Sequence, residues 1–166
     1  MSENITGKIA RKYMAHFLDT SFGGQTPSWY RVGKDLEEFN VEMNPDIEQR
    51  KNILGANNFI HNGYETSANG EPFYARNGDA LFPKLQKIVD DRAQYEGTAT
   101  TALEVHLWEE GSTSGTFVAY TQQCYVIPSS YGGDTSGYQI PFTVYYVGQK
   151  TKGTYNTSNQ TFTPDA

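Results

Sequence analysis

The chain has 166 residues, a formal net charge of −6 at pH 7 and a single cysteine. That length fits one domain spanning residues 1–166, large enough to bury a core without disulfide bonds or a structural metal. Charged residues make up 19% and aromatic residues 14% of the chain, which excludes a charge-rich disordered protein and a coiled coil. The acidic balance also argues against a protein that grips nucleic acid by neutralising its phosphates.

The amino-terminal segment is polar. Residues 1–12 carry Lys8, Arg11 and Lys12, and we expect them to form a flexible arm that becomes ordered on assembly. They lack the apolar region of a signal peptide, and no apolar run in the chain approaches the roughly 20 residues needed to cross a bilayer. The sequence therefore predicts no membrane segment and a protein made and kept in the cytoplasm.

The first half of the chain contains four predicted strands, at residues 15–20, 29–32, 36–43 and 59–66. In the third of these, Phe39, Val41 and Met43 alternate with three polar residues. If the strand is regular, the polar residues share the opposite face; they are Glu38, Asn40 and Glu42. That face is either a solvated surface or an acidic wall turned toward a cavity or channel.

The stretch between the third and fourth strands, residues 44–55, combines apolar side chains with a polar setting. Its notable residues are Asn44, Pro45, Ile47, Ile53 and Leu54. A loop of about twelve residues in a compact domain is uncommon unless it is functional. Two interpretations are open: a loop that docks on another molecule, or a short helical turn that packs Ile47, Ile53 and Leu54 on the chain's own core.

One α-helix is predicted at residues 79–93. Leu81, Leu85, Ile88 and Val89 recur at spacings of three and four residues, which is typical of a helix with one apolar face. Asp79 is the expected N-cap. We expect this helix to lie on a sheet.

The second half of the chain contains further predicted strands, at residues 103–107, 116–127, 138–147 and 152–155. Residues 111–149 carry one charged side chain, Asp134, beside eight aromatic ones. A surface so poor in charge is expected to be covered, either by a second sheet or by other copies of the chain. The predicted fold is mainly β, a β-sandwich or split barrel with one flanking helix.

The sequence offers no compact set of catalytic or metal-binding residues. His16, His61 and His106 stand in separate predicted strands without a Cys or His at ligand spacing. Phosphate-binding glycine loops and a serine elbow are absent from the sequence, and Cys124 is interpreted as a buried packing thiol. We therefore predict neither an enzyme nor a bound cofactor or metal.

Several segments, in this order, resemble one family: the major tail proteins of long non-contractile-tailed phages and prophages of Gram-positive bacteria, which build the tail tube. The resemblance covers roughly residues 13–164 and rests on the order and spacing of its segments. They are WYRVGKD (29–35), NP (44–45), NILG (52–55), GYE (63–65), EPFYAR (71–76), YGGD (131–134), GYQIPF (137–142) and KGTY (152–155).

The resemblance implies a subunit that forms hexameric rings, which stack into a tube through which DNA passes during ejection. It implies tape-measure, tail-terminator and tail-tip proteins as partners, assembly in the host cytoplasm and a final place in the virion. Residues 44–55 would then dock on the next ring, and Glu38, Asn40 and Glu42 would line the channel.

Two alternatives stay open at this stage. β-Sandwiches rich in Tyr and Trp also bind carbohydrates or peptides, so a tail-associated binding module is one alternative. The other is the inner tube of a contractile tail or of a phage-tail-like bacteriocin, because the family grades into those tube proteins.

Overall fold

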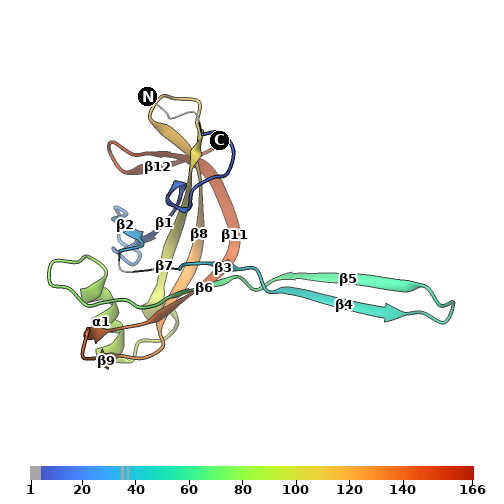
Figure 1. The fold of residues 1–166 in the computed structure, drawn as a ribbon, viewed down its shortest axis with the longest axis horizontal. Helices are drawn as coiled ribbons and strands as arrows, with labels where there is room; N and C mark the ends of the chain where they lie inside the picture. The colour runs from blue at the N-terminus through green and yellow to red at the C-terminus, as the bar shows by residue number, and fades with distance from the viewer. Residues whose placement is uncertain (1–4, 35, 37) are drawn as a thin grey trace.

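The computed structural model describes residues 5–34, 36 and 38–166 (Figure 1). Strands dominate these residues, and they contain one α-helix, α1 (Phe82–Asp91), with short 3-10 turns at Arg11–Tyr13 (η1) and Tyr95–Thr98 (η2). The strands are β1 (Met14–Asp19), β2 (Trp29–Val32), β3 (Val41–Glu42), β4 (Pro45–Lys51), β5 (Asn57–Tyr64), β6 (Ser67–Gly70), β7 (Ala99–Glu110), β8 (Thr116–Pro128), β9 (Gly132–Asp134), β10 (Gly137–Gln139), β11 (Phe142–Asn156) and β12 (Thr161–Pro164).

Eight strands form one antiparallel sheet in the order β2-β1-β7-β8-β11-β6-β3, with β12 pairing the far half of β11. The sheet curls into a half-barrel around its long strands β7, β8 and β11 (Figure 1). This architecture confirms the predicted class: a mainly β fold of the sandwich or split-barrel type with one helix.

The main core lies between the sheet and α1. Leu81, Leu85 and Val89 from the helix region pack with residues that face them from the long strands, such as Val126 and Phe142. The Asp79 carboxylate accepts hydrogen bonds from the N–H groups of Leu81 at 2.8 Å and Phe82 at 3.4 Å. The helix predicted at residues 79–93 is therefore confirmed, with its ends inside that range. Leu81 rather than the predicted Asp79 occupies the N-cap position, and Asp79 holds the turn that leads into the helix.

A second apolar cluster lies on the opposite face of the sheet, toward the end at which β12 pairs. It is built around the buried residues Ala15, Leu103, Val105, Ala119 and Tyr155, and Phe17, Trp29 and Phe162 pack against them. Both faces of β7 and β8 are thus apolar along part of their length. This explains why residues 116–127 read as a long run of β-formers rather than as a strict alternation.

The strand predicted at residues 138–147 is split in two. The chain pairs as β10 up to Gln139, and β11 begins only at Phe142. Pro141 has no N–H to donate to a ladder, and its carbonyl oxygen instead accepts the N–H of Ser129 at 2.9 Å. β11 then continues to Asn156 and absorbs the separate strand predicted at residues 152–155.

β4 and β5 form a two-stranded hairpin that pairs with no other strand in the part of the chain that the structure describes. We call this hairpin, residues 45–64, the arm. It projects from the body on the side away from α1, and it is drawn in cyan to green in Figure 1. Seven- and eight-residue strands at about 3.4 Å per residue give the arm a length of roughly 25 Å.

Candidate functional site

Acidic and amide side chains line a shallow hollow of about 260 Å³ at one edge of the sheet. Glu38, Asn40 and Glu42 are joined there by Asn69 and Glu71. We call this surface the acidic face. The Asn40 side-chain amide donates a hydrogen bond to the Glu38 carboxylate.

The acidic face lies on the side of the sheet opposite α1. Phe39 is 6% exposed and Val41 packs against the main core, so the polar residues between them point outward. Asn69 is the register partner of Thr143, whose hydroxyl donates to the Asn69 side-chain oxygen at 2.8 Å. The three predicted residues do share one face; their exposure to a channel stays a prediction.

The strand predicted at residues 36–43 is much shorter in the structure. β3 contains only Val41 and Glu42, which pair with Ala68 and Ser67, and Glu38 adds an isolated bridge to Glu71. Residues 35 and 37 lie outside the described residues.

Met43 is not buried as Phe39 is, although the alternation in residues 36–43 places the two side chains on one side of the strand. Its side chain is 54% exposed, because the chain leaves the sheet at the next residue. That residue, Asn44, has a φ of 44°, in the left-handed region.

Asn44 holds the root of the arm. Its side-chain amide donates to the carbonyl oxygen of Glu65 at 3.0 Å, and its own carbonyl oxygen accepts the N–H of Glu65 at 3.3 Å. Asparagine tolerates the left-handed backbone needed at this turn. Pro45 then starts β4 opposite Tyr64, at the first residue of a strand, where proline is tolerated.

Asn52 organises the tip of the arm. Its side-chain oxygen accepts the N–H groups of Leu54 and Ala56, each at 3.0 Å, and Gly55 turns with a φ of 80°. These bonds leave Ile53 and Leu54 at the apex, 101% and 86% exposed. The tip is therefore a fixed turn that presents two apolar side chains to solvent.

An apolar stripe runs along one face of the arm. Ile47 pairs with His61, and the His61 ring contacts Phe59 and Tyr64 with centroid distances of 6.4 Å and 4.7 Å. Phe59 is 61% and Tyr64 54% exposed. These aromatic rings touch each other, and the body of the chain does not cover them.

Neither local conformation expected for residues 44–55 is correct. The stretch is β4 and a tight turn rather than a long loop. A helical turn that packs Ile47, Ile53 and Leu54 on the core is also excluded, because all three side chains are exposed. Docking of the five predicted residues on another ring is a separate matter and stays a prediction.

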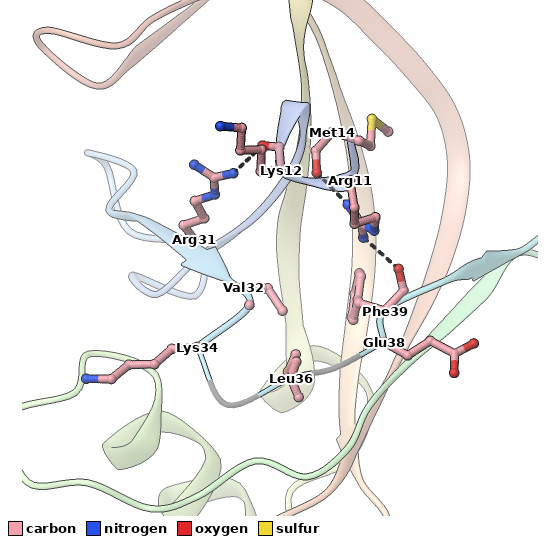
Figure 2. A pocket seen from close by; sticks show the side chains of 10 residues that line it. Arg11, Lys12, Met14, Arg31, Val32, Lys34, Leu36, Glu38 and Phe39 are labelled. Carbon is pink, nitrogen blue, oxygen red and sulfur yellow. Dashed lines mark hydrogen bonds between the residues drawn. The ribbon is translucent and has the colours of Figure 1, made fainter. Parts of the chain in front are cut away.

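A second hollow, of about 500 Å³, is lined by basic residues near the amino terminus (Figure 2). Arg11 donates to the carbonyl oxygens of Met14 at 2.6 Å and Phe39 at 2.8 Å. Arg31 donates to the carbonyl oxygen of Lys12 at 2.7 Å, and Lys34 completes the basic lining. Both guanidinium groups thus hold backbone in place. Of the amino-terminal segment that was predicted to be flexible, residues 1–12, residues 1–4 lie outside the described residues.

A third hollow, of about 780 Å³, is uncharged and rich in tyrosine. We call it the tyrosine groove. Its lining comes from the segment after α1, from η2 and from the adjoining strands, and it includes Ala93, Tyr95, Thr98, Tyr125, Ile127 and Tyr145. The side chains of Tyr95 and Tyr145 are 79% and 48% exposed.

The sequence contains one sign of this groove, namely large side chains at the outward-facing positions of two strands. The strand pattern alone does not show that these side chains form a site. Tyr125 and Ile127 alternate with the buried Cys124 and Val126, and Tyr145 follows the buried Val144. These large side chains occupy positions that an ordinary solvated face would fill with polar residues. They account for part of the charge-poor character of residues 111–149.

Two ionisable residues outside these surfaces, His16 and Cys124, are buried in the fold. Burial lowers the pKa of His16 to about 4, and its Nδ1 has no hydrogen-bond partner. Cys124 is a free and fully buried cysteine, as the sequence predicted, and burial raises the pKa of its thiol to about 12. Among the described residues, no group of three or more His, Cys, Asp or Glu side chains could hold a metal ion.

Comparisons with known proteins add no relative. Neither a scan against protein-family models nor a search of curated proteins finds a match for the chain. Within the part of the chain that the structure describes, no helix is long and apolar enough to cross a membrane.

Proposed function

We propose that this chain is the structural subunit of a phage tail tube, which assembles into stacked hexameric rings around a channel for DNA. The tube would be built in the host cytoplasm, together with tape-measure, terminator and tip proteins, and would end in the virion. The proposal is supported by the ordered sequence resemblance to the major tail proteins and by three features of the structure: the arm, the acidic face and the exposed tyrosines.

The arm is the observation that carries the proposal. Its tip and stripe expose Ile53, Leu54 and Phe59, and the chain's own body covers none of them. Full burial of such a side chain is worth about 1.5–3 kcal/mol. A roughly 25 Å hairpin with apolar side chains is costly in an isolated monomer, and contact with another subunit would remove that cost.

The acidic face supports the channel. It lies on the sheet surface away from α1, so a ring that turned its helices outward would repeat Glu38, Glu42 and Glu71 around the inside. Negative charge there repels phosphate and keeps DNA from binding as it slides.

The shape of the chain favours an assembly that propagates. The arm projects from one side of the body, away from α1 (Figure 1), so the surface that it offers differs from the surface of the body. A contact between unlike surfaces of identical subunits closes a ring when the rotation closes and stacks without limit when it does not. Both operations are needed to build a tube.

Removal of the arm tests the proposal. Pro45 and Tyr64 are opposite one another in the hairpin, so residues 46–63 can be replaced by Asn-Gly, the preferred two-residue hairpin turn. A deletion of residues 46–54 alone would leave β5 without its partner strand. The arm-less chain is expected to keep the parent's circular dichroism and to remain monomeric at concentrations at which the parent forms rings or tubes in electron micrographs.

A matched pair of variants isolates the apolar tip. Ile53→Ser with Leu54→Ser removes the exposed apolar side chains, whereas Asn57→Ser with Asn58→Ser changes two exposed polar residues of the same hairpin. We expect only the first pair to prevent assembly. Normal tubes from the arm-less chain would contradict the role of the arm.

A parent chain that stays strictly monomeric at millimolar concentration would contradict the tube proposal itself and would favour a binding module. Micrographs of tail particles distinguish the remaining alternative, because a contractile sheath around the tube would be visible.

A further inference from the structure

The tyrosine groove is an apolar hollow without an occupant in the chain that forms it. Its lining is free of charged side chains and presents Tyr95, Ile127 and Tyr145 to solvent, at 79%, 36% and 48% exposure. Apolar surface of this kind is typical of an interaction site. The chemistry that fits it is a small apolar segment with few charges.

The backbone at the groove supports a binding role. Tyr95 has a φ of 48°, a left-handed conformation that a bulky aromatic residue rarely adopts. Arg92, three residues earlier, has the same φ. Arg92 is the C-cap of α1, where a left-handed residue is common, so the unusual backbone is that of Tyr95. It holds an aromatic ring outward at the rim of the groove, and strain at such a residue is concentrated at binding sites.

The tip of the arm has the matching chemistry. Its apex, residues 52–57, is uncharged and carries Ile53 and Leu54, the two most exposed large apolar side chains among the described residues. The charged neighbours also complement each other, because Lys51 flanks the tip and Glu96 flanks Tyr95, and both are exposed. Apolar surfaces would meet at the centre, with opposite charges at the rim.

The tip cannot reach the groove of its own chain. The groove lies beside the carboxyl end of α1, and the arm projects away from that helix (Figure 1). The two strands pair from Pro45 and Tyr64 at the root to Lys51 and Asn57 near the tip, which places the tip roughly 25 Å from the root. A tip that fills the groove must therefore come from a second copy.

We propose that Ile53 and Leu54 of one copy seat in the tyrosine groove of a neighbouring copy, and that this contact is the docking step of the arm. The inference rests on the proposed function, and it identifies the surface of the neighbouring copy on which the arm docks. The groove and the acidic face share the side of the sheet turned away from α1: Tyr145 of the groove lies two residues along β11 from Thr143, whose hydroxyl donates to Asn69 of the acidic face. A docked tip would therefore lie beside the acidic face.

The size of the contact fits an array rather than a dimer. Two apolar side chains and their immediate neighbours bury far less than the roughly 1,200 Å² that a specific stable interface needs. One docked tip is therefore too weak to hold two free monomers together. Repetition of the contact around every ring raises its effective strength without any new chemistry.

Disulfide cross-linking tests the contact directly. Leu54→Cys protein is mixed with Tyr95→Cys protein under assembly conditions, oxidised and examined for cross-linked dimers, and micrographs are taken of the same sample. The control mixture pairs Leu54→Cys with Lys87→Cys, an exposed position on α1 whose side chain is 72% accessible. Cys124 can be left in place because it is fully buried. We expect at least tenfold more mixed dimer from the Tyr95 pair than from the control.

A second measurement uses substitutions that leave the core intact. Tyr95→Ala should raise the concentration needed for assembly about tenfold, whereas Tyr131→Ala, which removes a 52% exposed tyrosine outside the groove, should leave it unchanged. Tubes that form without cross-linking above the control would overturn this docking step, leave the tube proposal standing and assign the groove to another ligand, such as a peptide or carbohydrate. Absence of both tubes and cross-links would contradict the two proposals together.

Discussion

Arg11 donates a hydrogen bond to the backbone carbonyl oxygen of Phe39 across 2.8 Å, and the two residues are 28 positions apart in the chain. The same guanidinium reaches Met14 at 2.6 Å. One side chain thus connects the η1 turn to the segment that carries the acidic face. Only the forked geometry of arginine reaches two carbonyl oxygens in this way.

The first prediction follows from this fork. Arg11→Lys keeps the charge but can serve only one of the two carbonyl oxygens well, so it should lower the free energy of unfolding by about 1 kcal/mol. Denaturant titration measures the change, and Lys8→Ala, at an exposed position, is the control. Equal stability of the parent and Arg11→Lys would show that the connection contributes nothing.

The second prediction concerns the acidic face. Glu38→Lys with Glu42→Lys should slow DNA ejection from assembled particles, most strongly at low salt, because lysines on a channel wall would attract phosphate. The control is Glu109→Lys with Glu110→Lys, which makes the same change in charge at the end of β7, outside the hollow. Equal ejection rates for both variants at low salt would contradict the placement of the acidic face in the channel.

The third prediction concerns Gly70, which is buried against the ring of Phe142. A Cβ atom added to Gly70 would lie 2.5 Å from the Phe142 Cζ atom. Gly70→Ala should therefore destabilise the fold by about 1–3 kcal/mol. Combination with Phe142→Leu, which opens space at the same point, should recover part of that loss, and a thermal or denaturant double-mutant cycle measures the coupling. Strictly additive losses would mean that the two residues do not compete for space.

The fourth prediction concerns His16. Burial holds its folded pKa at about 4 against 6.5 for an unperturbed histidine. Above pH 6.5 both states are neutral and stability is complete, whereas below it the unfolded chain binds a proton that the folded chain does not. Stability should therefore fall between pH 6.5 and pH 4, by up to roughly 3 kcal/mol. The surrounding charges are Glu104, which raises the pKa, and Arg11, Lys150 and Arg31, which lower it.

The variant His16→Phe tests this assignment. It keeps an aromatic ring against Phe39, whose centroid lies 5.0 Å from that of His16, and it removes the unpartnered nitrogen. The difference in unfolding free energy between parent and variant should change with pH only between about 4 and 6.5. A constant difference across that range would show that His16 does not titrate as described.

Sequence reasoning predicted the elements whose side chains have one buried face. Leu85 and Val89 of the helix face the core, and so do the alternating residues Ile140, Phe142 and Val144. The spacing of apolar residues in the sequence therefore shows the helical and the strand periods. Cys124 was predicted as buried because it stands in the strand-like segment 120–128, and it does pack inward together with Val126.

Only half of the arm was predicted in this way: the strand predicted at residues 59–66 overlaps β5, whereas β4 and its pairing with β5 were missed. Both faces of the arm meet solvent, so β4 reads PDIEQRK, in which Ile47 is the one large apolar side chain and no apolar alternation marks a strand. β3 was overestimated for the opposite reason: Phe39 and Val41 point inward, yet most of that segment has no neighbouring strand with which to pair. The tyrosine groove depends on residues from the segment after α1, from η2, from β8 and from β11, which only the fold brings together.

A two-stranded ribbon with both edges open is marginally stable by itself, and the arm is such a ribbon. If subunits assemble as proposed, the ordering of the outer arm is completed only when a neighbour holds it, so the first contacts lose more conformational entropy than later ones. Growth from an existing ring would then be faster than the start of a new one. The arm would thus give the tube a nucleation barrier, which keeps free subunits soluble until a template is present.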